Sequence, residues 1–97
     1  MIQTQNPATG VVEQRFSPLS FNQVADALDR ADVAQRIHKT TSLAQRGACL
    51  TQMASLLLAQ KDHYAALMTR EMGKPLSQAV AEVEKCAAAC AYYATHG

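Results

Sequence analysis

The chain has 97 residues, of which 48% are apolar, so it is one domain at most, is not globally disordered, and would be marginally stable even if well packed. Nine Lys and Arg residues against eight Asp and Glu give a net charge of +1, which provides no electrostatic reason to expect nucleic acid or a membrane as a partner. Three cysteines without a C-x-x-C motif, no secretory signal and no apolar stretch of membrane-spanning length favour a soluble, reducing, cytoplasmic setting.

A β arm is expected over residues 1–18. Asn6 and Pro7 are typical of a turn, and Gly10 can adopt a positive φ. Residues 11–16 begin with β-branched side chains and are interpreted as a strand, with residues 1–5 as its hairpin partner. Because an isolated two-stranded hairpin is marginal in water, we expect this arm to dock on another element.

Helices are expected over the rest of the chain, at 20–36, 42–59, 62–72 and 75–95. Ser20 and Ser42 each precede a glutamine at the spacing of a capping box. Gly73 suits the left-handed residue that ends a helix, and Pro75 suits the first turn of the next one. The sequence therefore predicts a mainly α chain, with a short N-terminal β arm and about four helices.

Three of these helices carry apolar stripes. The stripe residues are Phe21, Val24, Leu28 and Ala31 in the first helix, Leu43, Gly47, Leu50, Ala54 and Leu57 in the second, and Tyr64, Leu67, Met68 and Met72 in the third. Gly47 costs about 1 kcal/mol relative to alanine inside a helix, unless a neighbouring backbone approaches it closely.

The fourth helix changes character along its length. Its first half is amphipathic, with Ala79, Val80 and Val83 on the inner face. Residues 86–94 are apolar apart from two tyrosine hydroxyls, and a helix that is apolar all round is usually buried on all sides. The remaining helices offer too little surface to surround it, so we expect its cover to be absent from this chain.

The residues predict no catalytic, cofactor-binding or metal-binding site. The four glycines do not form a phosphate-binding loop. Cys86 and Cys90 lie four residues apart, with His96 nearby, and could share a metal ion, but free cysteines are more often small core residues. Cys49 has no adjacent base that would activate it, so we interpret it as a packing residue as well.

Several segments closely resemble the N-terminal region of NAD(P)-dependent aldehyde dehydrogenases, and within that superfamily the succinate-semialdehyde dehydrogenases. They are NPATG at 6–10, REMGKPLSQAVAEVEKCA at 70–87 and CAYYATHG at 90–97, and the segment 27–50 between them is similar to its family counterpart. The resemblance covers essentially the whole chain. EMGKP followed by an E-V-E helix is its most specific part.

The resemblance implies part of the α/β aldehyde dehydrogenase fold, an oxidoreductase that binds NAD or NADP on a Rossmann-type domain. The parent family oxidises an aldehyde to a carboxylic acid through a cysteine thiolate and a glutamate-activated water. These groups lie downstream of the matched region in the family, so the resemblance gives no such role to Cys49, Cys86 or Cys90. It implies that residues 1–97 are a truncated N-terminal part of such an enzyme, inactive alone and without a cofactor of its own.

For the truncated enzyme, the expected partner is the missing remainder of the dehydrogenase or a homologous subunit. Two other interpretations of the chain stay open. The alternative is a small helical interaction protein that docks through its apolar C-terminal helix, since exposed apolar patches mark interfaces. A self-sufficient four-helix domain would instead show one cooperative thermal transition.

Overall fold

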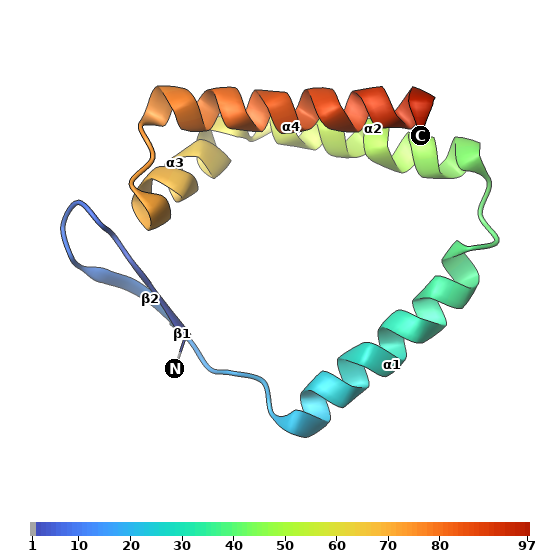
Figure 1. Cartoon of the computed structure of the whole chain (residues 1–97), viewed down its shortest axis with the longest axis horizontal. Coiled ribbons are helices and arrows are strands. Elements are labelled where there is room, and N and C mark those ends of the chain that lie inside the picture. The colour runs from blue at the N-terminus through green and yellow to red at the C-terminus, as the bar shows by residue number, and fades with distance from the viewer. Residues whose placement is uncertain (1) are drawn as a thin grey trace.

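A computed structural model describes residues 2–97 as a β hairpin followed by four helices (Figure 1). The elements are β1 (Ile2–Gln5), β2 (Val12–Phe16), α1 (Phe21–His38), α2 (Leu43–Ala59), α3 (Lys61–Met72) and α4 (Leu76–His96). The predicted mainly α architecture with a short β arm is thus confirmed. Every helix boundary lies within two residues of the expected one. The two differences with a structural meaning are that α1 continues to His38, and that Pro75 is the N-cap of α4 rather than its first helical residue.

The hairpin pairs β1 with β2 in antiparallel register, from Ile2 opposite Phe16 to Gln5 opposite Val12. At its turn, the Asn6 side-chain oxygen accepts from the Ala8 amide at 2.9 Å, and Gly10 has a φ of 75°. The arm does dock on another element, because β1 contacts α3.

Three helices form the packed part of the chain, which we call the body. α4 lies along α2 and also packs on α3, as Figure 1 shows at the top of the view. The side chains buried in it are almost all alanine, and they are Ala54, Ala65, Ala79, Val83 and Ala87. Such a thin core requires backbones that approach each other closely.

Gly47 shows how close that approach is. A Cβ atom at this position would lie 2.6 Å from the carbonyl oxygen of Ala94 on α4. The condition under which a helical glycine is favourable, a neighbouring backbone at short range, is therefore met here.

α1 lies apart from the body. Within residues 2–97 it packs against no other helix or strand. Its apolar stripe exists but is uncovered, since Phe21 is 88% exposed and Leu28 is 67% exposed. The periodicity identified the apolar face correctly, but nothing in this part of the chain lies against that face.

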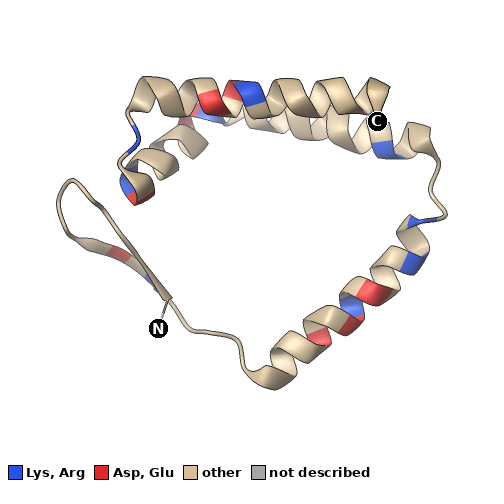
Figure 2. Ribbon diagram, viewed as in Figure 1, with Lys and Arg blue, Asp and Glu red and all other residues tan. Residues whose placement is uncertain are grey.

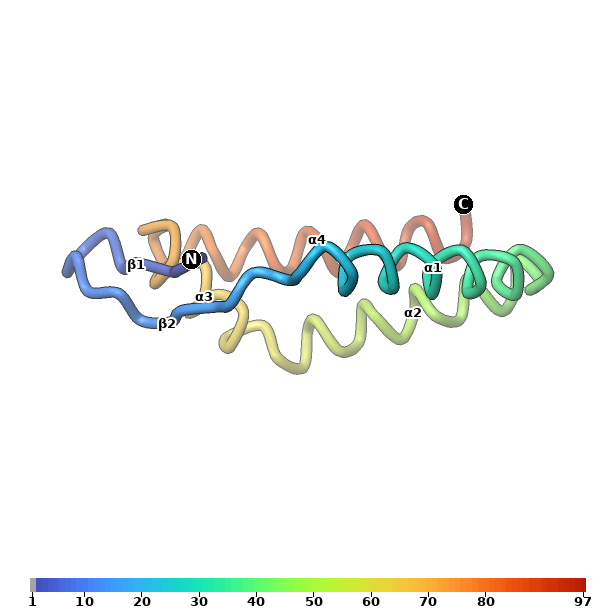
Figure 3. Tube along the Cα trace, turned by 90° about the horizontal axis from the view of Figure 1, so that it is seen from below, coloured from blue at the N-terminus to red at the C-terminus, as the bar shows by residue number. Residues whose placement is uncertain are grey.

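The overall shape is a flat, open arrangement rather than a globule (Figures 1 and 3). Its extents are 48 × 38 × 16 Å, and its radius of gyration is 17.4 Å, against about 12.5 Å for a compact domain of this length. The accessible surface is 7529 Å², roughly 2,100 Å² more than the ~5,400 Å² expected for a compact protein of 10.5 kDa. The chain therefore leaves a large area unburied.

Candidate docking surface

The uncovered apolar surface is the feature of this chain that most directly bears on function. It has three parts, which lie on α1, between α3 and α4, and along the C-terminal half of α4. In each part at least one large apolar or aromatic side chain is more than half exposed.

The first part is on α1 and has two sides. Val24 and Leu28 lie on the face predicted from the sequence, and they are 45% and 67% exposed. Val33 and Ile37 are also exposed, on another side of the same helix. An 18-residue helix with apolar side chains on two sides and no packing partner is only marginally stable in water by itself.

The second part is a groove of about 320 Å³ between α3 and its neighbours, which we call the α3 groove. Its lining is mostly apolar and consists of Leu57, Tyr64, Leu67, Met68, Glu71, Met72, Val83 and Cys86. Methionine side chains adapt their shape readily, so the groove suits an apolar occupant more than a defined polar ligand.

The third part is the end of α4, residues 86–94. Ala87 is buried, and Cys90 and Ala94 are half-buried against α2. Tyr92 and Tyr93 remain 55% and 58% exposed. This segment is therefore covered on the side of α2 and open elsewhere, as its composition led us to expect.

Charged side chains are spread over the helices without a patch of one sign (Figure 2). Lys74 forms an ion pair with Glu82, and Lys61 lies 3.6 Å from Glu84. Both pairs join α4 to neighbouring segments, and both are partly exposed to solvent, which weakens the contribution of each to stability.

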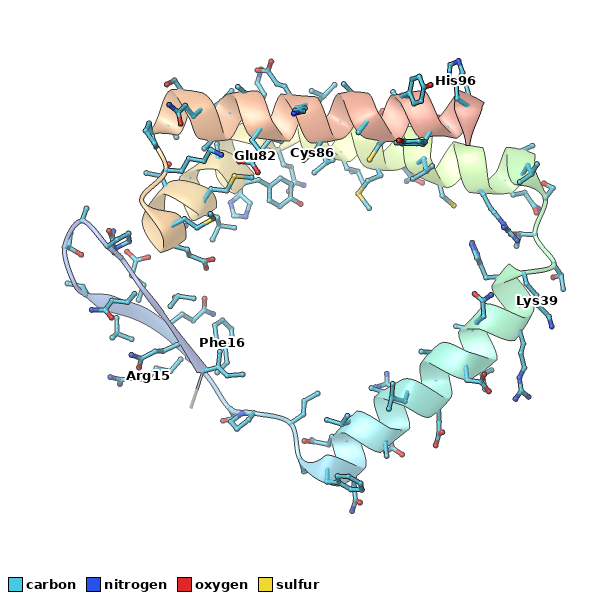
Figure 4. All side chains as sticks on the ribbon, viewed as in Figure 1. Arg15, Phe16, Lys39, Glu82, Cys86 and His96 are labelled. Atoms are coloured by element: carbon cyan, nitrogen blue, oxygen red, sulfur yellow. The ribbon has the colours of Figure 1, made fainter. Side chains whose placement is uncertain are left out.

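The cysteines are placed differently from the sequence-based interpretation. Cys49 and Cys86 are exposed, and Cys90 is half-buried, so the packing role is wrong for the first two within this chain. They lie on helix faces that nothing in residues 2–97 covers. Figure 4 labels Glu82 and Cys86 one turn apart on α4. Among the described residues, no three His, Cys, Asp or Glu side chains are grouped so that they could hold a metal ion.

Sequence reasoning passed over two residues that matter in the structure. Ala65 on α3 is fully buried, although no stripe included it. Arg46 on α2 bonds to the segment that connects α1 and α2, whereas its sequence context gave no reason to assign it a role.

None of the helices in residues 2–97 combines the length and the apolarity needed to cross a bilayer.

The comparison with known families identifies this arrangement. The model of the aldehyde dehydrogenase family matches residues 1–97, and the chain belongs to that family. Its relatives include succinate-semialdehyde dehydrogenases, as the sequence motifs predicted.

Two curated relatives illustrate the likeness. The chain is 45% identical over 93 residues to a probable succinate-semialdehyde dehydrogenase [NADP(+)] of Synechocystis, and 42% identical over 93 residues to a succinate-semialdehyde dehydrogenase [NADP(+)] of Mycobacterium leprae. Each match covers 96% of this chain and 20% of the relative. The chain thus spans about a fifth of the length of these relatives and corresponds to their N-terminal part.

Solved structures agree with this placement. A structure of Gox0499, described as giving insights into cofactor and substrate selection, superposes with a TM-score of 0.90 at 38% identity. The succinic semialdehyde dehydrogenase of Streptococcus pyogenes, in complex with NADP+, gives 0.89 at 36% identity. Each superposition covers 95% of this chain and 20% of the other. The open arrangement of the helices is therefore also found inside much larger enzymes.

Proposed function

We propose that this chain serves as the N-terminal scaffold segment of a succinate-semialdehyde dehydrogenase-like enzyme and contributes no catalytic group. The observation that carries the proposal is the roughly 2,100 Å² of surface in excess of a compact protein of this mass. That excess includes the exposed faces of α1 and of the end of α4. If it were buried against a partner of matching area, the interface would fall in the size class of obligate interfaces.

The proposed reaction of the complete enzyme is oxidation of succinate semialdehyde to the carboxylic acid with NADP+ as hydride acceptor. The support comes from the relatives, whose names give this aldehyde and this cofactor. The structure of the Streptococcus pyogenes relative holds NADP+ as well.

The residues of this chain do not fit the cofactor. Backbone amides at a glycine-rich turn or several free cations would be needed to hold a pyrophosphate. A cavity of about 610 Å³ along α4 is lined by Lys74 and Lys85, but Glu82 pairs with Lys74 there. We therefore assign no nucleotide contact to residues 2–97, and derive no step of the reaction through them.

The uncovered surface is proposed to bind the part of such a dehydrogenase that has no counterpart in this chain. That part is either joined to the chain or supplied as a separate subunit. The alternative of docking through α4 alone has less support, because large exposed apolar side chains are more frequent on α1 than on α4. A cytoplasmic location is part of the same proposal and is supported by three free cysteines.

The test is a complementation assay. The 97-residue chain, alone or mixed with a Synechocystis relative that lacks its first fifth, is given succinate semialdehyde and NADP+. We expect NADPH formation only from the mixture. Turnover by the chain alone, above a heat-killed control, would show that it carries catalytic groups. No turnover and no association in the mixture would contradict the scaffold role.

A further inference from the structure

The direction in which α1 points needs a physical cause. Since α1 packs against no other element within residues 2–97, helix packing does not set that direction. The remaining restraints are the segments at its two ends. The segment before it, 17–19, forms no turn, whereas residues 39–42, marked at Lys39 in Figure 4, form a hydrogen-bonded bend.

The bend caps the C-terminal end of α1. The amide and the hydroxyl of Thr40 both donate to the Ile37 carbonyl, at 3.1 and 2.7 Å. The amide and the hydroxyl of Thr41 both donate to the His38 carbonyl, at 3.0 and 2.7 Å. These bonds satisfy carbonyls that would otherwise lack partners, but they stay within α1 and the bend and do not reach α2.

Arg46 provides the link to α2. Its Nε donates to the Thr41 hydroxyl at 3.2 Å, and its Nη2 donates to the His38 carbonyl at 3.1 Å. Arg46 and Thr41 are half-buried, whereas residues 38–40 are exposed. A planar guanidinium holds its donors at fixed relative positions, and its charge lies at the C-terminal, negative end of the α1 dipole.

We propose that Arg46 is a positioning residue that holds α1 at one angle to α2. The apolar face of α1 then has its binding orientation before the rest of the dehydrogenase associates. Part of the entropy cost of ordering α1 is therefore not added to the free energy of association. This second consequence rests on the proposed scaffold function, whereas the fixed angle does not.

The angle is measured first, on the 97-residue chain. Spin labels are placed at native Cys49 on α2 and at the thiol introduced by Asn22→Cys on α1, in a background with Cys86→Ala and Cys90→Ala. We expect a narrow distance distribution, which Arg46→Ala broadens by at least about twofold because the bend becomes a free hinge. Arg36→Ala is the matched control: its 2.7 Å ion pair with Asp32 lies entirely within α1, so the distribution should not change.

Two further variants keep the measurement decisive if Arg46→Ala loses helix content by circular dichroism. Thr41→Val removes the acceptor of Nε and leaves the charge of α2 intact. Arg46→Lys keeps the charge but loses the two-donor geometry. Broadening in these variants supports the positioning role. A distribution that is already broad in the parent chain, or that stays narrow in all folded variants, overturns it.

The second measurement is the association rate with the truncated Synechocystis relative. We expect Arg46→Ala to slow association by about tenfold and to leave dissociation nearly unchanged, because the partner itself holds α1 once bound. If Arg46→Ala associated at the same rate as Arg36→Ala, the orientation of α1 before binding would not matter for association. Failure of the parent chain to associate would overturn the scaffold function, and the spin-label result would still decide the role of Arg46.

Discussion

Gly47 lies where the backbones of α2 and α4 approach each other closely. An added methyl group would lie 2.6 Å from the Ala94 carbonyl oxygen, a distance that requires one backbone to move. Overpacking of this kind costs about 1–3 kcal/mol, and the better helix propensity of alanine returns about 1 kcal/mol. We expect Gly47→Ala to lower the free energy of unfolding by up to about 2 kcal/mol in urea titrations followed by circular dichroism.

Gln52→Ala is the control for that substitution, because residue 52 is exposed on the same helix and should gain only the propensity term. If Gly47→Ala were as stable as Gln52→Ala, the close approach of α2 and α4 would be wrong.

Thr69 makes the opposite kind of prediction. Its hydroxyl oxygen is buried on α3 without a hydrogen-bond partner among the described residues. Such a group costs about 1–3 kcal/mol in lost hydration, and valine has nearly the same shape without that cost. We expect Thr69→Val to raise the midpoint of thermal unfolding, by an amount that corresponds to about 1 kcal/mol in the free energy of unfolding.

Thr51→Val provides the comparison for Thr69, because the Thr51 hydroxyl is exposed and donates to the Gly47 carbonyl at 3.1 Å. This variant should be neutral or slightly less stable than the parent chain. A lower midpoint for Thr69→Val would mean that the Thr69 hydroxyl has a partner.

At the scale of elements, α1 and α2 begin in the same way but differ in their packing. Ser20 accepts from the Gln23 amide at 3.2 Å, and Ser42 accepts from the Gln45 amide at 3.1 Å. In both helices the glutamine reaches back to the serine amide. Only α2 then packs on another helix.

This difference predicts different outcomes for the same substitution. Ser42→Ala should destabilise the whole body by about 1 kcal/mol, because α2 is part of its core. Ser20→Ala should raise amide exchange in α1 and leave exchange in α4 unchanged, since α1 opens by itself. Hydrogen exchange followed by mass spectrometry distinguishes the two. If both variants changed the rate of amide exchange in α4 by the same amount, α1 would be coupled to the body.

The elements were predictable because their signals are local. The two capping boxes and the left-handed Gly73, with a φ of 74°, depend on residues within one turn of each other. The burial of each face was less predictable. Leu43 and Met72 belong to predicted stripes but are 74% and 71% exposed, because periodicity shows which side of a helix is apolar and not whether a partner covers it. Arg46 was missed for a related reason: its two acceptors are a hydroxyl and a carbonyl that come within reach only when the bend is folded.

At the scale of the whole molecule, an open chain of 17.4 Å radius and high helix content is an unusual state for a monomer. The buried side chains of its body are four alanines and Val83, and many of the larger apolar side chains of the chain are exposed. Sequence alone indicated an uncovered end of α4. It did not indicate that α1 would be uncovered as well, because α1 has an ordinary amphipathic pattern that is compatible with packing inside a small bundle.

The uncovered surface leads to a prediction for the free chain in solution. Contiguous apolar patches of more than a few hundred Å² are rare on monomers and cause association. We expect the chain at micromolar concentration to bind the dye ANS and to show a mass above 10.5 kDa by light scattering. Leu28→Gln should lower the ANS signal without changing the stability of the body, because Leu28 is 67% exposed on a helix that packs against nothing in the described chain.

The control for Leu28→Gln is Asp29→Asn, which changes the neighbouring residue but removes no apolar surface and should leave ANS binding unchanged. Addition of the truncated Synechocystis relative should suppress the signal of the parent chain, since the same faces would then be buried. A dye-silent chain with a mass of 10.5 kDa and one sharp thermal transition would show that α1 folds back onto the body in solution. In that case these faces would need no partner, and the chain would be a self-sufficient helical domain.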